Sequence, residues 1–286
     1  MRTAGPATWI LISSLLFATM SALVKSAAAD ISVPAMVLFR NLPSALGLLG
    51  FAVIRGLPIS LAHWRLHAIR SALGVAGMGL SFYAIGQLPL ATATTLEYTA
   101  PLFIMLGLFL FGGKRVSLPE LVIMATGFAG VLLLLRPTLQ ADQSLPFLAG
   151  LATGGTAAAA YRMVWRLGRA GEPGWRIVLF YSVVAVVLAL LALPLAPASN
   201  YTAKSIWTLI GIGLVGMGAQ LTMTHAFRIG STTLLATLQY TTVIFSASLG
   251  VLFWGDRPTL AGTGGLVLIL LSGIYAVRDL SRQQAG

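Results

Sequence analysis

The sequence has 286 residues, of which 57% are hydrophobic and 9% charged, with a mean hydropathy of +0.90. A soluble domain is about a quarter charged, so this composition excludes one and indicates an integral membrane protein. The net charge is +11, from 18 basic and 7 acidic residues, and the absence of cysteine excludes disulfides, thiolate metal sites and cysteine nucleophiles.

Apolar stretches of about 18 to 22 residues recur along the chain, each long enough to cross a hydrocarbon core of roughly 30 Å as a helix. We predict ten spans, at about residues 8–28, 34–54, 67–87, 91–111, 118–136, 146–166, 175–195, 205–227, 232–253 and 259–278. Such continuous runs argue against a β-barrel, whose strands alternate over about ten residues. The first run ends at Lys25 without a convincing cleavage site, which favours a retained span over a signal peptide.

The basic residues are distributed unevenly between the two predicted faces of the membrane. One face receives Arg2, Arg55, Arg65, Arg70, Lys114, Arg115, Arg162, Arg166, Arg169, Arg176, Arg228, Arg278 and Arg282. The other face receives Lys25, Arg136, Lys204 and Arg257. Because Lys and Arg collect in cytoplasmic loops, we expect the rich face and both termini to be cytoplasmic. The excess charge therefore reports topology, and no nucleic-acid partner is predicted.

Two parts of the chain match when the sequence is displaced by 142 residues. YAIGQLPLATATTLEYTAPLF at 83–103 aligns with HAFRIGSTTLLATLQYTTVIF at 225–245, and LFGGKRVSL aligns with LFWGDRPTL further on. This repeat predicts two halves of five spans, residues 1–142 and 143–286, within one membrane domain. An odd number of spans places the second half upside down, and inverted repeats are typical of transporters with a site near the midplane.

These motifs resemble the drug/metabolite transporter superfamily in its ten-span, EamA-type form. The similar residues are Lys25, Arg40 in MVLFRNLPSALG, and the run LEYTAPLF with its counterpart LQYTTVIF, although Pro101 of the first run is Val243 in the second. The sequence is most similar to the aromatic amino acid exporter branch. The resemblance implies an all-α fold of ten transmembrane helices, built from two inverted five-helix repeats around a central cavity in the bacterial inner membrane.

Glu97 is an acidic residue within a predicted span, whereas the other acids fall in or beside loops. An ionisable group in the hydrocarbon region is costly unless it is paired or faces a polar interior, so Glu97 is a candidate site residue. The alternative is a structural glutamate satisfied by hydroxyl groups or by Arg40. Pro101 leaves the carbonyl of residue 97 without a helical donor, which fits either a wet cavity or an ordinary proline kink.

The repeat places Gln239 and Tyr240 at positions equivalent to Glu97 and Tyr98, and we expect the substrate between them. Further candidates to line the site are Tyr83, Tyr161, Trp165, Gln220 and His225. Each also suits packing, because Trp and Tyr collect at membrane interfaces and a buried histidine is often structural. Structural or gating roles are expected for Pro101, Arg40 and Lys25.

The predicted function is export of a small amphipathic metabolite, an aromatic or other neutral amino acid, by alternating access. Aromatic side chains would stack on its apolar part, and Glu97 or Gln239 would bind its ammonium group. The alternative substrates are organic cations and drugs, bound by cation–π contacts, or another metabolite of the superfamily. Protons are the candidate coupling ion, and no cofactor or metal is expected. An intramembrane enzyme is disfavoured because one carboxylate and one histidine form neither an aspartyl dyad nor a metal site.

Overall fold

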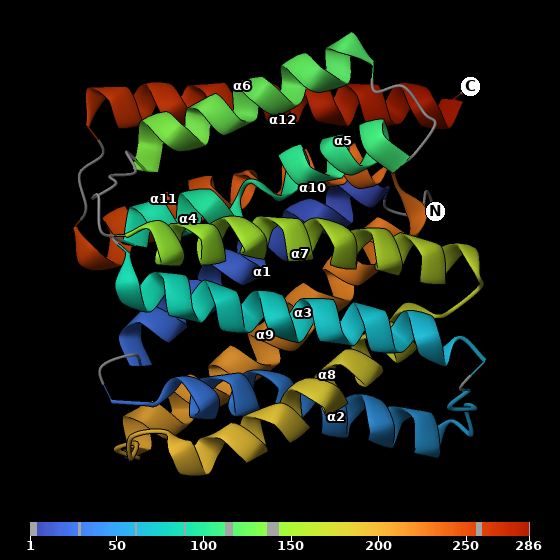
Figure 1. The fold of residues 1–286 in the computed structure, drawn as a ribbon, viewed down its shortest axis with the longest axis vertical. Coiled ribbons are helices and arrows are strands. Elements are labelled where there is room, and N and C mark those ends of the chain that lie inside the picture. The colour runs from blue at the N-terminus through green and yellow to red at the C-terminus, as the bar shows by residue number, and fades with distance from the viewer. Residues whose placement is uncertain are drawn as a thin grey trace.

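The computed structural model describes residues 5–27, 30–60, 62–88, 90–111, 117–135, 143–255 and 259–285. Within these ranges the fold is a bundle of long helices that lie side by side, without strands (Figure 1). The helices are α1 (Pro6–Ala27), α2 (Val33–Ile54), α3 (Trp64–Gln87), α4 (Leu90–Glu97), α5 (Ala100–Phe111), α6 (Leu118–Leu135), α7 (Ser144–Arg169), α8 (Gly174–Ala192), α9 (Ala203–Ile229), α10 (Thr232–Leu238), α11 (Thr241–Trp254) and α12 (Leu260–Ala285), with a 3-10 turn, η1 (Leu193–Leu195), after α8.

Most of the predicted spans correspond to helices suited to a bilayer. Among the residues described, seven segments are long and apolar enough to cross a membrane: α1, α2, α6, α8, α9, the α10–α11 pair and α12. The predicted spans at 67–87, 91–111 and 146–166 correspond to α3, the α4–α5 pair and α7, so the count of ten stays a prediction. Large apolar side chains such as Ile54, Leu195 and Leu260 are more than four-fifths exposed, as expected where lipid rather than water covers the surface.

Helices from the two halves of the chain interleave. The displacement of 142 residues relates α1 to α7 and α3 to α9. In the structure α1 packs along α9, and α3 packs along α7, so one contact occurs twice with its partners exchanged. Two other contacts, of α6 with α12 and of α2 with α8, join helices that correspond to each other. This pattern is what a two-fold repeat produces, although the boundary between residues 142 and 143 stays a prediction.

Two glycines allow α6 and α12 to cross with their main chains in contact. A Cβ atom on Gly130 would lie 2.6 Å from the carbonyl oxygen of Gly265, and one on Gly265 would lie 2.9 Å from the amide nitrogen of Leu134. Main-chain atoms cannot turn aside as a side chain can. Small residues at helix crossings of this kind are common in membrane proteins, where close approach replaces the hydrophobic effect between helices.

We expect Gly265→Ala to destabilise the fold by about 1–3 kcal/mol, the usual cost of overpacking. Thermal unfolding in detergent would measure this as a lower Tm. Gly264→Ala is the matched control, since a Cβ atom there meets nothing within 4 Å. Equal Tm values for the two variants would contradict the close crossing.

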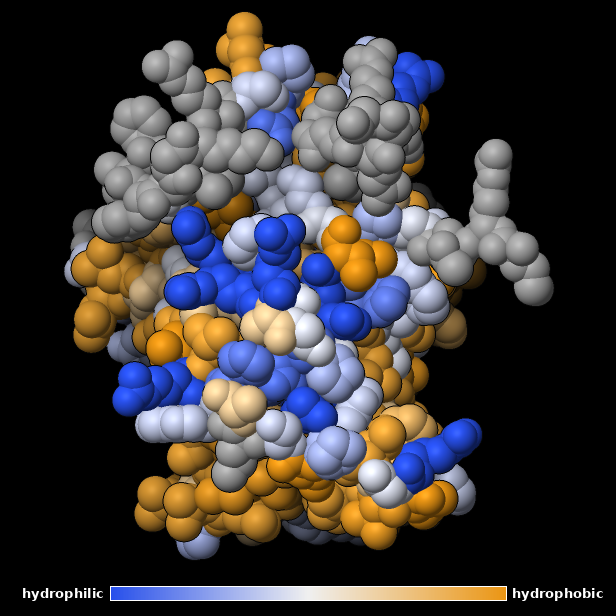
Figure 2. Space-filling view, turned by 90° about the vertical axis from the view of Figure 1, so that its right-hand side faces the viewer, coloured by the Kyte–Doolittle hydropathy of each residue, from blue (hydrophilic) through white to orange (hydrophobic). Residues whose placement is uncertain are grey.

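Basic side chains gather at one end of the bundle. Figure 2 views this end and shows a hydrophilic patch bordered by apolar surface. Arg55, Arg65, Arg166 and Arg169 are exposed near the end of α2, the start of α3 and the end of α7. The uneven distribution read from the sequence is therefore present in three dimensions. That this end faces the cytoplasm stays a prediction.

A buried carboxylate, Glu172, ties together the loops beneath this patch. Its side chain is 3% exposed, and its Oε2 lies 2.8 Å from Arg176 Nη1 and 3.6 Å from His67 Nε2, while Oε1 lies 3.0 Å from His63 Nδ1. Arg176 also donates to the Pro58 carbonyl at 2.6 Å, which joins the α2–α3 loop to α8. Burial alone would raise the pKa of Glu172. Hydrogen bonds from His63 and Arg176, together with the charges of Arg176 and His67, lower the pKa by more than burial raises it. The pKa of Glu172 therefore lies below its usual value.

We expect Glu172→Gln to destabilise the protein by about 1.5–3 kcal/mol at neutral pH, the usual contribution of hydrogen bonds to a charged group. Because the pKa of Glu172 is lower in the folded state, its stabilisation is complete above the unfolded pKa of about 4.3 and is lost as the pH falls through the folded pKa. The Tm difference between wild type and variant should therefore shrink in acid. Glu120→Gln is the control, since the hydrogen bonds of Glu120 to described residues stay within its own turn, at Ser117. A Tm difference independent of pH would contradict the role of the charge.

Candidate functional site

Both helices that carry the predicted site are interrupted, and at corresponding residues. The first break separates α4, which ends at Glu97, from α5, which begins at Ala100. The second separates α10, which ends at Leu238, from α11, which begins at Thr241. Pro101 accounts for the first break, since proline has no amide hydrogen to donate to the carbonyl of residue 97. The second helix breaks without a proline.

The same side-chain hydrogen bond closes each break. Thr99 donates its hydroxyl hydrogen to the carbonyl oxygen of Leu96 at 2.5 Å, and Thr241 donates to that of Leu238 at 2.7 Å. These residues are equivalent under the displacement of 142. The Leu96 carbonyl also accepts the main-chain amide of Thr99 at 3.1 Å, so the hydroxyl adds a second bond there. Polar main-chain groups beside an interruption in a membrane helix need partners within the protein, and each break has this one.

The two breaks meet through a pair of equivalent tyrosines. The rings of Tyr98 and Tyr240 pack edge to face, with centroids 6.2 Å apart. Tyr240 is completely buried, and Tyr98 also interacts with the side chain of Thr242 beyond the second break. The two halves therefore touch at their interrupted helices.

Charged and polar side chains surround the first break. Glu97 is exposed, although Leu96 and Thr99 beside it are 6% exposed. The charge of Arg40, from α2, acts on the Glu97 carboxylate. The ion pairs found among the described residues all involve Glu172, so Glu97 and Arg40 are not in a direct salt bridge. Neither charge is therefore neutralised by an ion pair within the described residues, and Arg40 Nη1 contacts the Met78 sulfur at 3.8 Å.

Tyr161, from α7, connects the two breaks. Its hydroxyl group lies near the side chain of Gln239 and within range of the charge of Glu97. Its ring stacks on Phe227 of α9, with centroids 4.4 Å apart. The group formed by Glu97, Arg40, Tyr161 and Gln239, together with the tyrosine pair, is the candidate site. It offers a carboxylate, a guanidinium, an amide and aromatic faces.

Other candidates from the sequence lie apart from this group. Trp165, near the end of α7, is 38% exposed. The guanidinium carbon of Arg169 lies 5.8 Å from the centroid of the Trp165 ring. His225 packs edge to face against Trp9 of α1, with centroids 5.1 Å apart. Both environments suit packing or the membrane interface.

Four further residues predicted from the sequence remain to be placed. Gln220 is buried and reaches Thr224 of its own helix at 3.5 Å. Tyr83 is 44% exposed on α3. Pro101 is buried at the start of α5, whereas the side chain of Lys25 lies outside the part of the chain that the structure describes.

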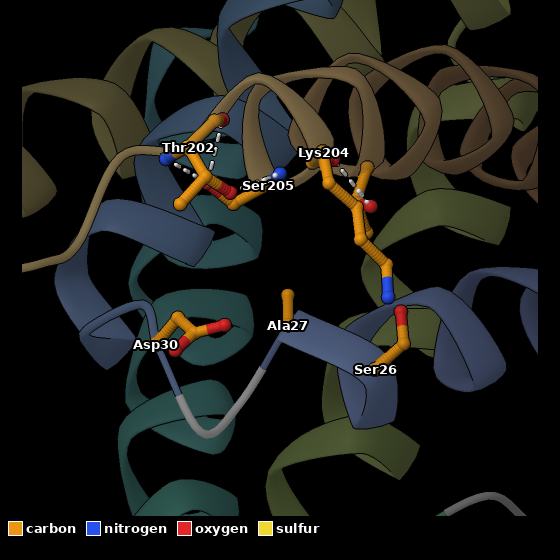
Figure 3. Close-up of a pocket in the computed structure, with 7 residues that line it drawn as sticks. Ser26, Ala27, Asp30, Thr202, Lys204 and Ser205 are labelled. Carbon is orange, nitrogen blue, oxygen red and sulfur yellow. Dashed lines mark hydrogen bonds between the residues drawn. The ribbon is translucent and has the colours of Figure 1, made fainter.

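A small pocket lies at the opposite end of the bundle from the basic patch (Figure 3). It is formed where α1 ends and α9 begins, and its lining consists of Ser26, Ala27, Asp30, Thr202, Lys204, Ser205 and Thr208. Thr202 and Ser205 are already engaged there, as the reciprocal cap that begins α9. The pocket has none of the aromatic or guanidinium groups found at the breaks, and we assign no substrate to it.

Apolar helices, interleaved halves and paired breaks together define a helical membrane transporter built from a repeated unit. The EamA-like transporter family matches residues 5–136 and again residues 146–278. The chain therefore belongs to this family, as the resemblance of its motifs predicts, and is a transporter rather than an enzyme. The double match also supports the internal repeat.

Relatives of known name agree with this assignment. The pseudopaline exporter CntI of Pseudomonas aeruginosa is 31% identical over 278 residues, which cover 96% of this chain and 95% of the exporter. A riboflavin transporter of Brucella anthropi is 28% identical over 232 residues, which cover 76% of this chain and 78% of the relative. A crystal structure with a TM-score of 0.83 covers 97% of this chain and 98% of its own, and its 20% identity supports the fold alone. These names differ from the aromatic amino acid exporters that the sequence resembles, so the substrate is a matter for proposal.

Proposed function

We propose that the protein exports a small amino acid or amino acid derivative, with both an ammonium and a carboxylate group, across the bacterial inner membrane. The observation that carries this proposal is the exposed Glu97 at a helix break, under the charge of Arg40. One acid and one base near aromatic faces suit a zwitterion with an apolar part. Aromatic and other neutral amino acids belong to this class, and the similarity to pseudopaline exporters supports export of a metabolite.

Organic cations and drugs are the weaker candidates. Aromatic faces would attract them, but the guanidinium of Arg40 repels a permanent cation that has no carboxylate. Export of cations would need Arg40 to turn away from the site.

The paired breaks suggest how the site opens. Each interrupted helix can change its angle at the break while the threonine hydroxyl still satisfies the carbonyl. Because the breaks are equivalent, movement at one break and then at the other would open the site first to one side and then to the other. Glu97 is the candidate carrier of a coupling proton.

Counterflow in proteoliposomes tests this function. The panel would contain phenylalanine, tryptophan, leucine, pseudopaline, riboflavin and the organic cation tetraphenylphosphonium. We expect internal zwitterions to accelerate uptake of labelled zwitterions. Transport of the cation alone, or of no compound, would contradict the proposal.

The absence of cysteine allows a clean test of orientation. We propose that the basic patch and both termini face the cytoplasm, following the bias of Arg and Lys. A single cysteine at the exposed Arg169 should resist an impermeant thiol reagent in intact cells and react in inverted vesicles. Labelling in intact cells would reverse the orientation.

A further inference from the structure

Arg70, in α3, is a buried cation that no acid in the described part of the chain neutralises. The sequence places it among the cations of the rich face, but its side chain is 4% exposed. Its Nε and Nη1 atoms have no hydrogen-bond partner, and the ion pairs described all involve Glu172. The guanidinium lies 4.4 Å from the ring centroid of Tyr181, on α8. Such a contact offsets only part of the cost of burying a charge.

The surface of α3 itself leaves room for the guanidinium of Arg70. Gly74 lies one turn beyond Arg70, and a Cβ atom on it would collide with Nη1 of Arg70 and lie 2.8 Å from Cε2 of Tyr181. The absence of a side chain at Gly74 therefore allows the guanidinium and the tyrosine ring to pack directly against α3. The position of the charge is fixed by its surroundings.

Arg70 lies beside the candidate site, because α3 packs along α7, the helix that carries Tyr161. The charged and polar groups that act on Arg70 are Tyr181, Tyr161 and Arg40. Tyr161 is the residue that lies near Gln239 and within range of the charge of Glu97. The site and its surroundings therefore contain two guanidinium groups and one carboxylate. A neutral amino acid would leave one of these guanidinium groups without an anion.

We propose that Arg70 binds a carboxylate of the exported substrate, and that the transporter prefers amino acid derivatives with more carboxylate than ammonium groups. This inference rests on the proposed function of the same site. A guanidinium forms charge-assisted hydrogen bonds with a carboxylate, and the Nε and Nη1 atoms of Arg70 are donors without a partner in the protein. Arg40 binds the second carboxylate, and Glu97 binds the ammonium group.

The test compares two substrates that differ by one carboxylate, phenylalanine and 4-carboxyphenylalanine, as competitors in proteoliposome counterflow. Wild type should prefer 4-carboxyphenylalanine. Arg70→Gln should reduce this preference by about tenfold or more, because the paired charge is lost, and Arg70→Lys should keep part of it. Arg65→Gln, which removes an exposed arginine from the same helix, should leave the preference unchanged.

A purely structural role for Arg70 predicts a different result. Arg70→Gln would then lower transport of both compounds by the same factor, together with the Tm, and this outcome would overturn the inference. If Arg70→Gln does not fold, Gly74→Ala displaces the guanidinium and keeps its charge, and it should reduce the same preference. Gly79→Ala is its control, since a Cβ atom there meets nothing within 4 Å.

The two proposals fail in different ways. Equal transport of the two compounds by wild type would overturn the role of Arg70 and leave the proposed function intact. Transport of neither compound, nor of any other zwitterion in the panel, would overturn the proposed function itself.

Discussion

Glu97→Gln should weaken the binding of ammonium-bearing substrates by about 10- to 100-fold, because a hydrogen bond to a charged group contributes about 1.5–3 kcal/mol. The variant should fold normally, since the equivalent position of the second half already holds an amide, Gln239. If Glu97 carries the coupling proton, the variant should also lose the dependence of transport on a pH gradient. Proteoliposomes with and without an imposed gradient measure both effects.

Glu120→Gln is the control for this prediction, because it removes a carboxylate at the start of α6. Unchanged substrate affinity in Glu97→Gln would contradict the role in substrate binding. Unchanged gradient dependence would contradict the role in proton transfer. The two roles can therefore be separated with one pair of variants.

Gly154→Ala should slow transport, because it obstructs an element that is expected to move during the cycle. Gly154 is the point where α7 touches the first break. A Cβ atom there would collide with the Thr99 hydroxyl and lie 3.1 Å from the Leu96 carbonyl oxygen. The added methyl group would therefore disturb the hydrogen bond that closes the break.

Initial rates of counterflow measure this effect, and thermal unfolding should show a loss of about 1–3 kcal/mol from overpacking. Gly155→Ala is the control at the next residue, where the nearest atom to a new Cβ is Phe103 Cδ1 at 3.8 Å. Normal transport by Gly154→Ala would show that α7 need not stay close to the break.

The helices were largely predictable, because a run of about 20 apolar residues has few alternatives to a membrane helix. The first break was predictable in part, since Pro101 removes a helical donor. The second break has no proline, and only its alignment with LEYTAPLF indicates it. The threonine that closes each break carries no distinct signal in the sequence.

The arrangement of charges was less predictable. Arg70 lies close to the predicted start of the third span, where it looks like a loop residue. Its burial depends on Tyr181, which is more than a hundred residues away in the chain. The Glu172 cluster likewise joins His63 to a residue 109 positions later, which no local pattern reveals.

The exchange of partners between α1–α9 and α3–α7 has a consequence for the origin of the fold. A half expressed alone would leave the packing surfaces of α1 and α3 uncovered, because helices of the other half cover them. An ancestor with one copy would therefore have assembled as two identical chains inserted in opposite directions. Because the bias of Lys and Arg sets orientation, such a chain would need a weak bias, whereas the joined chain can gather its arginines at one end.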